Sequence, residues 1–159
     1  MVDGRTFGPW IAILVAPSRP IPMSRIRASA AIAWALPWTL FGLAIGVLGL
    51  ATGGRARRIG KTVEFWGGLV AWYLRVFPLV SGAAAVTFGH AILGRSLADL
   101  QSSRDHELVH VRQYERWGPL FVPAYLFHWI RLWALGRDPY RDNPFERQAF
   151  EEAVSAAGD

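Results

Sequence analysis

The residues of this sequence best suited to chemistry are two histidines and a glutamate at the spacing of a metal-binding helix. They lie in the run His106-Glu107-Leu108-Val109-His110, which has the pattern H-E-x-x-H. Residues four apart share one face of a helix, so both imidazoles can reach the same metal ion. Two imidazoles, a carboxylate and a water form an open zinc site, in which Glu107 takes a proton from the metal-activated water. The alternative is a surface helix with two solvated histidines.

The sequence around the motif favours the metal site. Ser102 and Ser103 are candidate N-caps, and the predicted helix runs to Trp117, where Gly118-Pro119 ends it. Several residues of this helix form a single stripe at helical spacing: His106, His110, Gln113, Tyr114 and Trp117. Buried histidines need partners, and a metal ion provides one.

The third ligand is expected to be Glu146, in the run Asn143-Pro144-Phe145-Glu146. Asn143 is typical of an N-cap and Pro144 of a first helical residue, which predicts a helix from Pro144 to about Ala157. Its inward stripe comprises Glu146, Ala149, Phe150, Ala153 and Ala157. The alternative is that Glu146 serves only as a capping-box glutamate. The other downstream candidates are less well placed: Glu115, His128, Asp138, Asp142, Glu151 and Glu152.

The two motifs together carry a resemblance to a known family. The H-E-x-x-H helix, followed by a helix containing Glu146-Arg147-Gln148-Ala149 (E-x-x-A), resembles the gluzincin branch of zinc metallopeptidases. The small size resembles the minigluzincins, and the runs His106 to Gly118 and Asp138 to Glu146 are similar to a group of uncharacterised bacterial membrane proteins. The resemblance covers roughly Pro37 to Ala153.

The resemblance implies one Zn2+ ion held by His106, His110 and Glu146, with Glu107 as the catalytic base. It also implies a β-strand bordering the cleft ahead of the metal helix, and residues 86–93 are the candidate for it. Arg112, Gln113 and Tyr140 are candidates for substrate contact or for support of the ligands. The pattern assigns no tyrosine or histidine to stabilise an oxyanion.

Composition indicates a membrane-associated protein. The chain of 159 residues is 52% hydrophobic and 18% charged, with eight tryptophans and a net charge of +5. The basic residues are not clustered on one helix with interleaved aromatics, which argues against nucleic acid as a partner. There is no cysteine, so disulfides, thiolate ligands and cysteine nucleophiles are excluded.

We expect three regions along the chain: a flexible leader over 1–27, a transmembrane helix over 28–52, and a compact zincin-like domain over 53–159. Residues 28–52 carry no charge and are long enough to cross a bilayer, with Pro37 as a site for a kink. The alternative is a buried core helix. Gly42 and Gly46 form a G-x-x-x-G motif that suits a homodimer of this helix. The basic run Arg55 to Lys61 follows it and suits anionic lipid.

Further elements complete the predicted fold. Residues 62–66 are β-prone, and 69–80 form either an amphipathic surface helix, which we favour, or a second, broken membrane segment. Residues 119–135 are predicted as an apolar, membrane-facing helix. The fold class is therefore mainly α with a few short β-strands (α+β), with a single pass through a bacterial inner membrane. If the chain starts at Met1, equal numbers of basic residues precede and follow the predicted span, and its orientation is not decided. If it starts at Met23, the basic residues favour a cytoplasmic C-terminal domain.

The leading functional hypothesis is a membrane-anchored zinc-dependent hydrolase, a peptidase acting on a peptide or protein substrate. The second is a catalytically inactive or structural metal-binding membrane protein that acts as an interaction module. A fourth protein ligand, His128 or His90, would close the site and favour the second hypothesis. A third reading is that the H-E-x-x-H pattern is coincidental.

Overall fold

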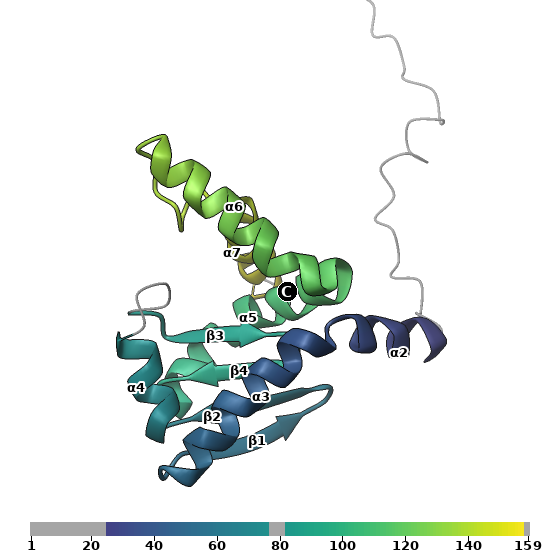
Figure 1. Cartoon of the computed structure of the whole chain (residues 1–159), viewed down its shortest axis with the longest axis vertical. Coiled ribbons are helices and arrows are strands. Elements are labelled where there is room, and N and C mark those ends of the chain that lie inside the picture. Colours follow the sequence, from purple (N-terminus) through teal and green to yellow (C-terminus); the bar gives the residue numbers. More distant parts are fainter. Residues whose placement is uncertain (1–24, 77–81, 158–159) are drawn as a thin grey trace, which may run out of the picture.

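A computed structural model describes residues 25–76 and 82–157, which form helices around a small four-stranded sheet (Figure 1). The predicted α+β class is confirmed. In chain order the elements are α2 (Arg25–Trp34), α3 (Leu36–Ala51), β1 (Arg55–Ile59), β2 (Thr62–Trp66), α4 (Gly68–Val76), β3 (Ala85–Phe88), β4 (Ala91–Gly94), α5 (Leu97–Trp117), η1 (Gly118–Leu120), α6 (Phe121–Ala134) and α7 (Pro144–Ala157).

The sheet has the strand order β1-β2-β4-β3, with β2 parallel to β4 and the other two pairs antiparallel. Helices α3 and α4 cover one face and α5 covers the other, and α6 and α7 rise beyond the β3 edge (Figure 1). Side chains alternate accordingly: Phe65 and Leu93 pack in one core cluster with α4, whereas Ile92 packs with Leu100 of α5. All four residues of β4 are buried because helices cover both faces.

The uncharged N-terminal segment is two helices rather than one. It breaks at Ala35, and the axes of α2 and α3 differ by 60°. Pro37 lies in the first turn of α3, where its ring and missing N–H prevent the preceding helix from continuing. The kink anticipated at Pro37 is therefore a full break. Within 25–76 and 82–157, no single helix is long and apolar enough to cross a membrane, although α2 and α3 together are.

The glycines of α3 bring this helix close to the sheet and to α4. A Cβ atom built on Gly42 would lie 2.8 Å from the Cβ of Ala91, and one built on Gly46 would lie 2.5 Å from the ring of Phe65. The G-x-x-x-G spacing thus serves a contact within the chain. It makes α3 part of the folded domain, which therefore extends beyond the predicted 53–159.

Several predicted boundaries are corrected. Helix α5 begins at Leu97, capped by Ser96, whose hydroxyl accepts a hydrogen bond from the Asp99 N–H at 3.1 Å. Ser102 and Ser103 lie inside the helix and donate to the Asp99 carbonyl instead. The first residue of α2, Arg25, falls within the predicted leader, whose residues 1–24 lie outside the described chain.

The predicted strand over 86–93 is a hairpin. Gly89, with φ of +60°, and His90 form the turn between β3 and β4. A positive φ suits glycine, and the turn reverses the chain in the middle of an apolar run. Elsewhere, β2 matches the predicted strand over 62–66, α4 ends at Val76 before the undescribed residues 77–81, and the helix expected over 119–135 is η1 followed by α6.

The close contact between α3 and the sheet gives a stability prediction. Gly46→Val forces a side chain into the ring of Phe65 and is expected to lower the free energy of unfolding by about 1–3 kcal/mol. Ala44→Val is the matched control, because Ala44 is exposed on the same helix; its expected cost is below about 0.7 kcal/mol. Denaturant unfolding in mild detergent measures both. Equal costs would show that α3 does not lie on the sheet as described.

Candidate metal centre

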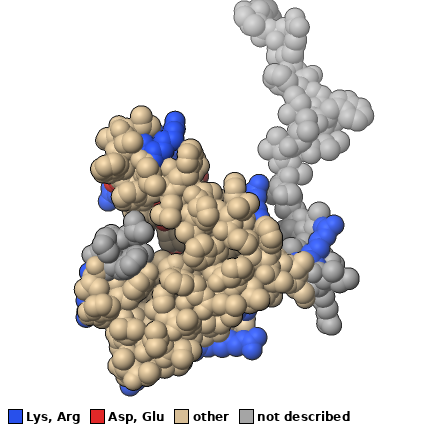
Figure 2. All heavy atoms as spheres, viewed as in Figure 1, with Lys and Arg blue, Asp and Glu red and all other residues tan. Residues whose placement is uncertain are grey.

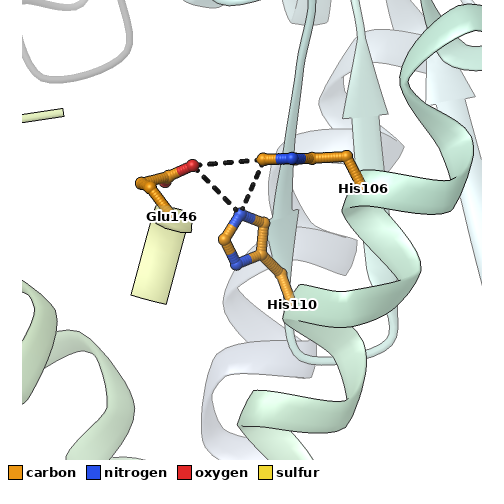
Figure 3. Close-up of side chains that lie close together, drawn as sticks. All are labelled: His106, His110 and Glu146. Atoms are coloured by element: carbon orange, nitrogen blue, oxygen red, sulfur yellow. Dashed lines mark hydrogen bonds and ion pairs between the residues drawn. The ribbon is translucent and has the colours of Figure 1, made fainter. Parts of the chain in front are cut away.

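Helix α5 holds the two histidines between the sheet and α7. Its core face includes Leu100 and Val111, which pack against the sheet, while His106 and His110 point toward α7 (Figure 3). Their Nε2 atoms lie 3.1 Å apart. The spacing of four residues therefore brings both ring nitrogens to one point, as the sequence predicts.

Glu146 enters the same point from the first turn of α7. Asn143 caps this helix, since its Oδ1 accepts a hydrogen bond from the Phe145 N–H at 3.2 Å. The Glu146 carboxylate does not return to the cap: the Asn143 N–H donates to the Tyr140 carbonyl. Instead, Glu146 Oε2 lies 3.1 Å from His106 Nε2 and 3.6 Å from His110 Nε2. The geometry favours the ligand interpretation of Glu146 over the capping box.

The three side chains fit a metal ion. Ligand atoms about 2.0–2.1 Å from a tetrahedral zinc ion are about 3.3 Å from one another, and the three distances here are 3.1, 3.1 and 3.6 Å. Glu146 Oε2 is also buried beside these two imidazole nitrogens and meets no other hydrogen-bond donor among the described residues, so a bound cation would satisfy it. His106, His110 and Glu146 thus form a group that could hold a metal ion.

Surrounding polar groups orient these ligands. The Gln113 amide nitrogen donates to the Phe145 carbonyl at 3.0 Å, so its Oε1 is left to accept from His110 Nδ1 at 2.8 Å. This bond places the His110 proton on Nδ1 and leaves the Nε2 lone pair for a metal. The Tyr125 hydroxyl donates to Glu146 Oε1 at 2.8 Å.

Glu107 is buried beside the group and is held by the sheet. The Thr87 hydroxyl, on β3, donates to Glu107 Oε2 at 2.7 Å. Burial raises the pKa of Glu107, against the opposing effects of the histidines and of Thr87. A carboxyl group with a raised pKa in this position is suited to accept and return a proton.

Charges within the group perturb one another in the metal-free chain. Burial alone would lower the pKa of His110, but the hydrogen bond and charge of Glu146 outweigh it and raise this pKa to about 9. Burial alone would raise the pKa of Glu146, but hydrogen bonds from His106 and His110 lower it to about 2. At neutral pH the metal-free group therefore holds a proton on His110, next to the ionised carboxylate of Glu146.

Other predicted candidates lie elsewhere. Arg112 pairs with Glu152 at the surface. The ring of His128 lies 5.9 Å from that of Phe145. His90 Nε2 lies 3.0 Å from Glu115 Oε1. Among the described residues, the metal-binding group contains only His106, His110 and Glu146.

The structure also adds residues that the sequence did not indicate. Thr87 and Tyr125 contact Glu107 and Glu146 through long-range packing of β3 and α6, for which no local motif exists. Gln113 and Tyr140, both named as candidates from the sequence, do lie at the centre: Gln113 contacts His110, and Tyr140 lines the cavities on either side.

Two cavities meet at the metal-binding group. The first, of about 250 Å³, lies between α3, β3 and α6 and is lined mainly by aromatic and aliphatic side chains. The second, of about 420 Å³, lies between α5 and α7. His106, Glu107 and Tyr140 line both, so the group is accessible from two directions.

Comparison of the chain with known proteins found no matching family, curated protein or solved structure. The gluzincin resemblance therefore rests on the two sequence motifs alone.

The raised pKa of His110 predicts how metal binding depends on pH. A metal ion needs the neutral imidazole, so below the pKa of about 9 the metal competes with a proton. Zinc affinity is expected to rise with pH from neutrality up to that value, with release of roughly one proton per zinc. Calorimetry in buffers of different ionisation enthalpy measures both quantities, and pH-independent affinity would contradict the assigned pKa.

Zinc titration of variants tests whether these side chains are the metal ligands. The wild-type chain is expected to bind one zinc, and His110→Ala to lose nearly all of it, because one of the three ligands is removed. His128→Ala is the matched control, since that imidazole lies outside the group. Equal zinc content in wild type and His110→Ala would remove the site from these residues.

Proposed function

We propose that this protein is a zinc-dependent hydrolase, a peptidase of the gluzincin kind. The proposal rests on one observation: His106, His110 and Glu146 converge while the buried carboxylate of Glu107 lies beside them. Two imidazoles and one carboxylate suit zinc, and three protein ligands leave a coordination position for a substrate or water.

The chemistry divides between the ion and the chain. Zinc in such a site lowers the pKa of a water molecule and polarises a carbonyl group. Glu107 takes up the proton of the attacking water and then delivers it to the leaving amine, as its raised pKa suits. Thr87 holds Glu107 Oε2 and thereby orients the carboxylate. Gln113 and Tyr125 fix the ring of His110 and the carboxylate of Glu146.

The alternative, a structural or inactive metal site, has less support. A structural zinc site has four protein ligands. His128 and His90 were the candidates for a fourth, and both are engaged elsewhere, with Phe145 and Glu115.

The assigned base gives the test of the enzyme hypothesis. Glu107→Gln keeps the shape of the side chain but removes its basicity, so zinc should stay bound while the rate falls about 10²–10⁴-fold. Glu115→Gln is the control, because this glutamate on the same helix pairs with Lys61 and His90. Peptide hydrolysis and zinc content are measured together. Full activity in Glu107→Gln would exclude this residue as the base.

Thr87→Val tests the orienting role of the hydroxyl. It preserves size and removes the 2.7 Å hydrogen bond to Glu107. A loss of about tenfold in kcat, with unchanged zinc affinity, is expected because the carboxylate is no longer held. The pH at which activity falls on the acid side should also rise, since the hydrogen bond lowers the pKa of Glu107. An unchanged kcat and pH profile would deny Thr87 this role.

We also propose that the protein contacts a lipid bilayer through the outward face of α3 and α4. This surface, the α3–α4 face, consists of exposed apolar residues: Leu40, Phe41, Val47, Leu48, Trp72 and Val76. Figure 2 shows a broad surface without charged side chains, with lysines and arginines at its margins. An exposed apolar patch of this extent, rimmed by basic residues, suits an anionic lipid surface. Helix α6 adds Phe127, Ile130 and Trp133.

The fold favours α3 lying along the bilayer surface. A single-pass anchor remains a prediction of the sequence. If α3 crossed the bilayer, it would carry β1, with Arg55, Arg57 and Arg58, into hydrocarbon beside it, which is costly. In the surface arrangement, the glycine side of α3 stays on the sheet and the opposite side faces lipid.

Labelling distinguishes the two arrangements, because the chain has no cysteine of its own. Ser29→Cys and Ala51→Cys place single thiols at exposed positions on α2 and at the end of α3. In sealed vesicles, a membrane-impermeant maleimide is expected to label both from the same side. Labelling from opposite sides would establish the single-pass arrangement.

Vesicle flotation tests the face itself. Val47→Asp combined with Val76→Asp should weaken binding to vesicles of phosphatidylglycerol and phosphatidylcholine. Val154→Asp, an exposed valine on α7, is the matched control. Equal flotation of both variants would exclude the α3–α4 face.

A further inference from the structure

The first cavity connects the metal-binding group to the α3–α4 face. Phe41 belongs to both: it is 46% exposed on α3, and it also lines the cavity. Its ring packs edge-on against that of Phe88 on β3, at 5.0 Å between centroids. Opposite them, Val122 and Leu126 of α6 complete an apolar wall. Figure 2 shows the hollow between helix α6 and the part of the protein that contains the sheet.

The second cavity has a different wall. It is a mixed wall on the other side of the metal-binding group: Ser102, Ser103 and Asp105 of α5 supply polar groups, whereas Phe150, Ala153 and Val154 of α7 are apolar. Because His106, Glu107 and Tyr140 line both cavities, a chain that passed from one to the other would cross the group at their junction.

The size of the apolar cavity limits what it can take. Sites for small molecules usually measure about 300–1,000 Å³, whereas this one measures about 250 Å³. It has room for one or two apolar side chains, and too little room for the paired acyl chains of a phospholipid. Away from the metal-binding group, Phe41, Val122 and Leu126 offer no hydrogen bond to a polar side chain, which would lose its solvation beside them.

We propose that the substrate is a polypeptide with an apolar stretch next to a polar one, cut at their junction. The apolar side enters the first cavity from the bilayer at the α3–α4 face, and the polar side occupies the second cavity, open to water. This inference rests on the proposed hydrolase function and specifies its substrate class.

The first experiment uses the zinc-loaded full chain with a set of peptides. One peptide joins an apolar stretch of leucine, valine and phenylalanine to a polar stretch; in a second, serines replace the apolar stretch. We expect cleavage at the junction of the first peptide, seen by mass spectrometry, and a kcat/KM at least about tenfold lower for the second. Release of fatty acid from phosphatidylcholine vesicles in place of peptide cleavage would overturn the proposal.

The outcomes separate the two proposals. Equal cleavage of both peptides, or cuts scattered along them, would overturn the substrate assignment and leave the hydrolase function standing. A zinc-loaded chain that hydrolyses neither the peptides nor the phospholipid would overturn the hydrolase function, and the substrate assignment with it.

The second experiment changes the cavity. Leu126→Ser should lower kcat/KM for the apolar peptide about tenfold, with little effect on the serine peptide, so that the preference is lost. Leu135→Ser, at the C-cap of α6, is the matched control, because Leu135 is 59% exposed and does not line the cavity. Zinc content and melting temperature confirm folding, and Val122→Ser replaces Leu126→Ser if that variant unfolds. If a folded variant kept the wild-type ratio of kcat/KM between the apolar and the serine peptide, the substrate assignment would be overturned.

Discussion

The structure depends on a buried carboxylate set between two imidazoles. Glu146 is 4% exposed, and a charge in that position needs compensation that water cannot give. His106 and His110 provide it from α5, and Tyr125 provides a hydrogen bond from α6. The position of α7 against α5 therefore depends on this electrostatic compensation as well as on the packing of the buried Ala149. The same ion pairs bring two nitrogens and one oxygen to the spacing that the ligands of one metal ion have.

The sequence predicted the parts of this centre that are local. The H-E-x-x-H spacing places two imidazoles on one face of any helix. Asn143-Pro144 marks a helix start, because asparagine is a favoured N-cap and proline a favoured first helical residue. The inward direction of Glu146 followed from its place on an alanine stripe. These features needed no knowledge of the rest of the chain.

The non-local parts were missed for a physical reason. Thr87 reaches Glu107 only because β3 is an edge strand packed under α5, and the hairpin turn at Gly89 lies within an apolar run that resembles one strand. The start of α5 is a different case, because its signal is local: Ser96 and Asp99 bond to each other at the first turn, and Ser102 and Ser103 offer the same type of cap further along. Likewise, G-x-x-x-G indicates a close contact without specifying the surface that makes it: here the sheet and α4, rather than a second helix.

The order of the ligands along the chain has a mechanical consequence. His110 lies on α5 and Glu146 on α7, and the whole of α6 lies between them. An ion bound to both acts as a cross-link that closes α6 into a loop and removes conformational entropy from the open chain. Helix α6 is also a wall of the apolar cavity. A bound ion would therefore hold that wall in place, so it would maintain the shape of the cavity.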